Sequence, residues 1–150
     1  MPSTLRALTR GLVAGAAGTA MTAAQTAYLK ARGGEPSSTP AEVGRRIVEG
    51  VLQRDVPEER MGALNNVMHW LYGTSWGVLF GLSRAGRGSA PLGDGARFAG
   101  VVWGASLVEL PAMGLAPPVW KYPPDQLASD FGFHLVYGVG VATAYAVLDR

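Results

Sequence analysis

The sequence contains no cysteine, which excludes disulfide bonds, thiolate metal sites and cysteine nucleophiles. Charged residues are also scarce, at 16% of the 150 residues, compared with about a quarter in ordinary proteins. Thirteen basic and eleven acidic residues leave a formal net charge of +2, and the basic residues form no single run. This balance gives no support to nucleic-acid binding.

The H-E-x-x-H pattern of zinc proteases is absent too, and ordinary hydrolase chemistry finds little support. An enzymatic role is therefore not the leading interpretation.

The length predicts a single domain. Glycine is abundant, with 21 residues. Because glycine and alanine score weakly on hydropathy scales, they hold the mean hydropathy at only +0.15.

Four stretches of about 17 to 22 mostly apolar residues are long enough to cross ~30 Å of hydrocarbon. They cover residues 8–29, 62–82, 98–115 and 127–148. We therefore predict an all-α membrane protein with four transmembrane helices in one domain, residues 1–150.

Two alternatives to this interpretation stay open. Arg6 and Arg10 before the first stretch also suit a signal peptide. However, the stretch is long for a signal, and Gly11, Gly15 and Gly18 favour helix packing. A soluble helical protein would need amphipathic stripes, whereas residues 98–115 carry one charge all round, Glu109.

The segments between the stretches differ in character. Residues 40–54 predict an amphipathic helix. Three positions are open to it: flat on the membrane surface, over one end of the bundle, or as an ordinary connection between two spans. Residues 83–96 are rich in glycine, serine and arginine and predict a plain connector. Residues 116–124 hold four prolines around Trp120 and Tyr122, which predicts a rigid loop at the headgroup level.

The second and fourth stretches repeat each other at an offset of 65 residues, with His69 over His134 and Asn65 over Asp130. Small residues recur at every fourth position in both, which lets helix backbones approach closely in lipid. The predicted packing glycines are Gly11, Gly15, Gly73, Gly77, Gly81 and Gly138. We predict two helical hairpins related by a pseudo-twofold axis along the membrane normal, an arrangement known among transporters.

Six polar side chains fall at similar depth near one face of the predicted bundle, and we call them the polar layer. They are Gln25, Asn65, His69, Glu109, Asp130 and His134. An ionisable group in hydrocarbon costs at least about 2.5–3.5 kcal/mol, so it is normally paired and often functional. Asp130 and His134, four residues apart on a helix, are spaced to hydrogen-bond.

Four interpretations of the polar layer stay open. The two histidines could act as hydrogen-bonding glue between helices, or they could belong to a proton or ion pathway. A divalent metal could be held by His69 and His134 with Glu109 or Asp130. Haem between the histidines is disfavoured because close glycine packing leaves little room for a macrocycle. We predict no cofactor.

The charges at the ends of the stretches favour an orientation with both termini in the cytoplasm. On that side lie Arg6, Arg10, Arg84, Arg87, Arg97 and Arg150. The other side holds Lys30, Arg32, Arg60 and Lys121 near the ends of the stretches, and Arg45, Arg46 and Arg54, which are diluted by neighbouring acids.

The run PAMGLAPPVWKYPPDQLASDFGFHLVYG, residues 111–138, resembles the YagU-like family of bacterial inner-membrane proteins, a domain of unknown function. The resemblance rests on Met113-Gly114-Leu115, Pro117-Pro118-Val119, Asp130 and His134-Leu135-Val136. It implies a multi-span protein of the bacterial inner membrane and no established reaction. In that family the position of Glu109 is not acidic.

We therefore expect an integral membrane protein that transports protons, ions or small solutes through the polar layer. The alternative is a structural or assembly subunit whose glycine-rich faces pack against other membrane proteins. In either case the bilayer is the expected environment, and a homo-oligomer or a membrane-protein partner is possible on the same surfaces.

Overall fold

The computed structural model describes residues 2–35, 37–87 and 90–150. Within these ranges the chain forms α-helices joined by turns, and no β-strand. The helices are α1 (Pro2–Ala31), α2 (Thr39–Leu52), α3 (Met61–Arg84), α4 (Pro91–Ala112) and α5 (Pro124–Leu148). Single 3-10 turns, η1 (Glu58–Arg60) and η2 (Val119–Lys121), precede α3 and α5. The prediction of an all-α fold is confirmed.

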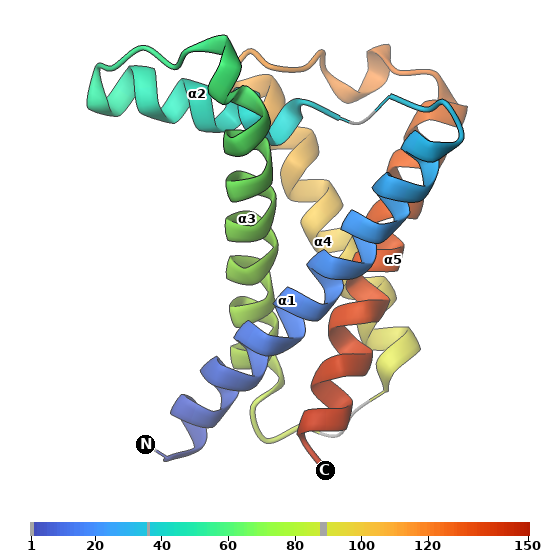
Figure 1. The fold of residues 1–150 in the computed structure, drawn as a ribbon. Helices are drawn as coiled ribbons and strands as arrows, with labels where there is room; N and C mark the ends of the chain where they lie inside the picture. Colours follow the sequence, from blue (N-terminus) through green and yellow to red (C-terminus); the bar gives the residue numbers. More distant parts are fainter. Residues whose placement is uncertain (1, 36, 88–89) are drawn as a thin grey trace.

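Four helices run along the length of the molecule, and α2 lies across one end beside the start of α3 (Figure 1). Both termini lie at the opposite end. We call these the α2 end and the termini end. α1 crosses the molecule obliquely and packs against both α3 and α5, while α4 packs against α5. The closest partners, α1 with α3 and α4 with α5, are thus the two predicted hairpins.

The third predicted stretch, residues 98–115, is wrong at both ends, because α4 begins at Pro91 and ends at Ala112. Proline at the first helical position starts the helix, and the Asp94 carboxylate accepts a hydrogen bond from the Ala90 backbone N–H (2.8 Å). The predicted connector 83–96 therefore contains the first turn of α4, and its residues 88–89 lie outside the described part of the chain.

Glycines in the left-handed region end two of the helices. Gly114 has a φ of +70°, and the Leu115 and Gly114 N–H groups bond to the carbonyls of Leu110 and Pro111. Gly33, with a φ of +86°, ends α1 with the same pattern of bonds. This is a Schellman motif, which satisfies the last carbonyls of a helix and requires a residue that tolerates positive φ.

Glycines also set the distance between α1 and α3. A Cβ on Gly11 would lie 2.6 Å from the Gly77 carbonyl oxygen, and one on Gly15 would lie 2.8 Å from the Gly77 Cα. A Cβ on Gly81 would overlap the Ala7 carbonyl, so the contact continues toward the termini end. These distances leave no room for any side chain, and the two backbones touch directly.

A second close approach joins α4 and α5. A Cβ on Gly95 would lie 2.6 Å from the Val139 Cα, and one on Gly138 would lie 2.9 Å from the Ala99 Cβ. Between the two hairpins, α1 meets α5 at Gly18, which lies against Val141. The buried core around these contacts comprises Ala14, Phe80, Val102, Tyr137, Val141, Ala142 and Tyr145.

The predicted pseudo-twofold relation is incomplete in one respect. α1 packs along α5, but its counterpart α4 meets α3 through side chains, with the Phe98 ring 4.8 Å from Phe80 and 6.2 Å from Trp76. The seam between α3 and α4 is therefore filled by aromatic rings rather than by backbone contact.

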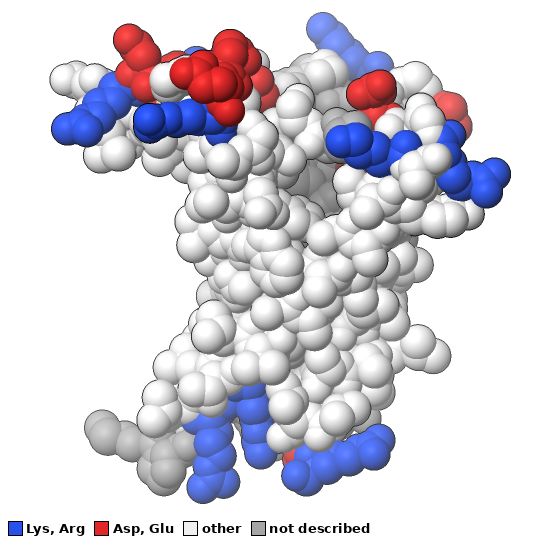
Figure 2. Space-filling model, in the orientation of Figure 1, with Lys and Arg blue, Asp and Glu red and all other residues white. Residues whose placement is uncertain are grey.

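The charged side chains on the face drawn in Figure 2 gather at the two ends of the molecule and leave the waist free of charge. Leucines and valines are exposed along the waist instead; they include Leu12, Val13, Val67, Leu71, Leu79, Val101 and Val108. One described helix, Pro124–Leu148, is by length and composition apolar enough to cross a membrane. The other long helices are enriched in glycine, alanine and hydroxyl side chains, which lowers their hydropathy.

Candidate functional site

On the side of α1 and α3, the polar layer forms two contacts near the α2 end. The His69 Nε2 atom lies 3.4 Å from the Thr22 hydroxyl of α1. One turn nearer the end, Asn65 accepts a hydrogen bond from the Ala41 N–H of α2 (3.0 Å). Asn65 thus satisfies a free N–H in the first turn of α2 and fixes that helix across the end of the bundle.

On the side of α4 and α5, Asp130 is the centre of the polar contacts. Its carboxylate accepts a hydrogen bond from the Trp103 indole N–H of α4 (2.9 Å). The His134 Nδ1 atom lies 2.9 Å from the Asp130 backbone carbonyl and 3.8 Å from its carboxylate. Asp130 and His134 therefore do contact each other, as their spacing predicts. The imidazole bonds to the Asp130 backbone carbonyl, however, and not to its carboxylate.

Glu109 connects α4 to α3, because its carboxylate accepts a hydrogen bond from the Tyr72 hydroxyl (3.2 Å). Gln25 differs from the rest of the polar layer. Its Oε1 atom is buried and has no hydrogen-bond partner within the described chain. A buried amide oxygen without a partner is costly, so this position is suited to a water molecule or a polar solute.

The polar layer is thus distributed over several contacts rather than gathered at one point. The hydrogen bonds of His69 go to α1 and those of His134 stay within α5. In residues 2–35, 37–87 and 90–150, no three histidine or acidic side chains are close enough together to hold a metal ion. The predicted set of His69, His134 and a carboxylate is not assembled in this arrangement.

A cavity of about 240 Å³ lies at the α2 end, between the C-terminal half of α4, the start of α5 and the loop that joins them. Asp130 is the one member of the polar layer that lines it, together with the hydroxyl groups of Ser37, Thr39, Ser106 and Tyr122. Figure 2 also shows the surface hollowed at this end, between α3 and the end of α1. The cavity at the α2 end is therefore lined by both polar and apolar side chains.

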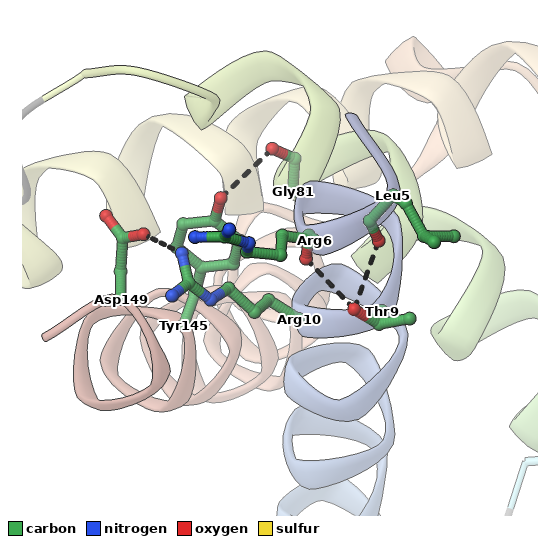
Figure 3. A network of polar contacts seen from close by, with 7 residues as sticks. All are labelled: Leu5, Arg6, Thr9, Arg10, Gly81, Tyr145 and Asp149. Atoms are coloured by element: carbon green, nitrogen blue, oxygen red, sulfur yellow. Dashed lines mark hydrogen bonds and ion pairs between the residues drawn. The ribbon is translucent and has the colours of Figure 1, made fainter. Parts of the chain in front are cut away.

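At the termini end, polar contacts between distant parts of the chain join the helices. Figure 3 shows Arg10 of α1 paired with Asp149 after α5, beside the Tyr145 hydroxyl, which donates to the Gly81 carbonyl of α3 (3.3 Å). On the other side of this end, Arg84 pairs with the buried Asp94 (3.0 Å). Three helices are thus held together where Arg10 and Tyr145 meet.

A second tyrosine on the same face of α5, Tyr137, donates a hydrogen bond to the Gly73 carbonyl (2.5 Å). Tyr137 and Tyr145 are eight residues apart, which places them on one side of a helix, and this spacing was the available signal. The ion pair of Arg10 with Asp149 joins residues 139 positions apart, so no local pattern could have revealed it.

One further motif in the sequence bears on hydrolase chemistry. Residues 73–77, GTSWG, match the G-x-S-x-G spacing of serine hydrolases. The structure places them in the middle of α3, where Gly73 and Gly77 contact α1 and Ser75 is exposed. A nucleophile elbow requires a sharp turn between a strand and a helix, so this stretch is a helix-packing segment.

The α2 end therefore holds a cavity beside Asp130 and, apart from its lining, the unpartnered Gln25 oxygen. No protein-family model, curated protein or solved structure matches this chain.

Proposed function

We propose that the protein is an integral membrane protein whose four long helices cross the bilayer. The observation that carries this proposal is the waist, which is free of charge on the face drawn in Figure 2 and exposes leucines and valines. Monomeric soluble proteins rarely expose apolar surface on this scale. The helices have 22 to 30 residues, which at 1.5 Å per residue gives roughly 33–45 Å, enough to cross ~30 Å of hydrocarbon.

In this placement α2 lies at the membrane surface. Ala41 and Gly44 are buried, and Gly44 packs against Leu64 and Met68 of α3. Farther along α2, the apolar side chains of Ile47 and Val51 are exposed. A helix with one polar face and one exposed apolar face is suited to the boundary between the headgroups and the acyl chains.

The charge of the two ends indicates the orientation. Six basic residues lie at the termini end (Arg6, Arg10, Arg84, Arg87, Arg97 and Arg150), whereas four lie near the ends of the long helices on the α2 side (Lys30, Arg32, Arg60 and Lys121). The positive-inside rule then puts both termini in the cytoplasm. The resemblance to YagU-like proteins favours the bacterial inner membrane, with the cavity opening to the outside.

Within this frame we propose that the polar layer takes up a proton, an ion or a small solute from the α2 end for transport. Support comes from the cavity beside Asp130, the unpaired Gln25 oxygen and the ion pair of Arg10 with Asp149, which joins α1 to the end of α5 on the opposite side of the molecule.

The second candidate is a structural subunit, and one observation favours it. His69, Asn65, Glu109, Asp130 and His134 each have a hydrogen-bond partner within the chain. The glycine faces proposed for partner binding do not support it, because those glycines are covered by the helices of this chain. A partner would have to use the exposed leucines and valines instead.

Substitution of His134 separates the two candidates. In proteoliposomes, the wild-type protein should carry a pH-dependent flux of protons or monovalent cations, and His134→Ala should lower that flux at least tenfold while leaving the melting temperature in detergent nearly unchanged. Ser75→Ala, at an exposed position on α3, is the matched control and should retain both. A large loss of stability in His134→Ala, or a wild type without flux, would reject transport in favour of a structural role.

A further inference from the structure

A second cavity lies at the other end of the molecule, on the seam between α3 and α4. Its volume is about 350 Å³, and it is open along one side. Its floor and walls are mainly apolar, formed by Trp76, Leu79, Phe80, Phe98 and Val101. None of the polar-layer residues lines it, so it is separate from the site described above.

This groove exists because α3 and α4 are not joined by glycine contacts as the other helix pairs are. The Phe98 ring packs on Phe80 (4.8 Å) and Trp76 (6.2 Å) and holds the two helices apart. The side chains of Leu79 and Val101 on either side are more than half exposed, at 53% and 59%. The rings therefore form the floor of a groove whose rims are aliphatic.

Charge marks the mouth of the groove at the termini end. Arg84, Asp94 and Arg97 line it, and the Arg84–Asp94 ion pair (3.0 Å) compensates one of the two arginines. Arg97 is exposed. Arg87 lies at the same end, and its guanidinium donates a hydrogen bond to the Ser83 carbonyl. The mouth therefore carries net positive charge, whereas the groove itself is apolar.

The groove is long enough for the part of a lipid chain that lies nearest the headgroup. Along α3 it extends from Trp76 to Arg84, eight residues or roughly 12 Å. Its charged end lies at the level where the helices leave the proposed hydrocarbon region, and its apolar end points toward the middle of the waist. A phosphate at the mouth and an acyl chain on the aromatic floor would match both halves.

We propose that the groove between α3 and α4 binds an anionic phospholipid of the leaflet at the termini end, with its phosphate held by Arg97 and an acyl chain lying on Phe80 and Phe98. Guanidinium groups bind phosphate through paired, charge-assisted hydrogen bonds. Basic pockets between transmembrane helices on the cytoplasmic side are suited to anionic headgroups. The inference rests on the membrane placement proposed above and is independent of transport.

The test compares phosphatidylglycerol with phosphatidylcholine of identical acyl chains. Each is titrated onto the full-length protein in a neutral detergent, and bound lipid is counted by native mass spectrometry. Phosphatidylglycerol should bind more tightly to the wild type. Arg97→Gln should weaken its binding about fivefold, the effect expected for one basic residue at an anionic headgroup. The binding of phosphatidylcholine should fall less, because the choline ammonium of that lipid neutralises its own phosphate. Arg54→Gln, the same change at the α2 end, is the matched control and should bind as the wild type does.

Val101→Trp and Leu79→Trp, which fill the groove from its two rims, should reduce the binding of both lipids, with folding checked by circular dichroism. Equal binding of the two lipids to the wild type would overturn the proposal, as would equal effects of Arg97→Gln and Arg54→Gln. A dimer that dissociates on Val101→Trp would show that a second copy of the chain occupies the groove, which would also overturn it. Release of the protein from membranes by carbonate would reject the membrane placement itself, whereas retention without lipid preference would reject only the lipid site.

Discussion

The contact between α1 and α3 allows a stability prediction with an internal control. Gly77→Ala would place a methyl group 2.6 Å from the Gly11 carbonyl oxygen and 2.6 Å from the Gly15 N. Both are backbone atoms and cannot turn aside, so the two helices must move apart by several tenths of an ångström or more. Overpacking of this kind costs about 1–3 kcal/mol.

The same substitution also has a favourable component, because alanine is better than glycine in a helix by about 0.8–1.0 kcal/mol. Gly100→Ala on α4 isolates that component, since a Cβ there would meet nothing within 4 Å. The helix-propensity terms of the two variants cancel on subtraction. The difference between them should therefore be the packing cost alone, about 1–3 kcal/mol.

Thermal unfolding in a mild detergent, followed by circular dichroism at 222 nm, measures this difference. For a chain of this size it corresponds to a melting temperature about 3–10 °C lower for Gly77→Ala than for Gly100→Ala. Gly100→Ala should match or slightly exceed the wild type. If the two variants melt together, α1 and α3 do not approach each other as closely as the structure places them, and the reasoning fails.

Two further outcomes are expected. Reporter fusions after Arg87 and Arg150 should be cytoplasmic and one after Tyr122 external, because the termini end carries the excess positive charge; disagreement between the first two would mean a wrong number of spans. Tyr137→Phe should lower stability by about 0.5–1.5 kcal/mol, since it removes the hydroxyl that bonds to the Gly73 carbonyl of α3. Tyr28→Phe, at an exposed position, is the control, and an equal loss there would contradict this role for Tyr137.

The helices could be predicted from the sequence because the information for them is local. Apolar stretches, prolines at helix starts and glycines after helix ends lie within a few residues of one another. The error at α4 has the same origin. The glycine-rich stretch before residue 98 has the composition of a loop, but Pro91 and Asp94 provide a helix start that composition alone does not reveal.

The glycine faces were predicted from periodicity, since residues four apart share one side of a helix. Periodicity does not say which helix lies opposite. The repeat suggests equivalent roles for Tyr72 and Tyr137, but the Tyr137 hydroxyl bonds to α3 whereas the Tyr72 hydroxyl bonds to Glu109 of α4.

The tertiary structure alone decided the features that join distant parts of the chain. His134 bonds to a backbone carbonyl rather than to the carboxylate of Asp130, which depends on side-chain rotamers. The ion pair of Arg10 with Asp149 and the aromatic groove between α3 and α4 depend on how the helices cross. Crossing geometry is set by the sum of many contacts along two helices, so it is a property of the packed bundle and not of any one segment.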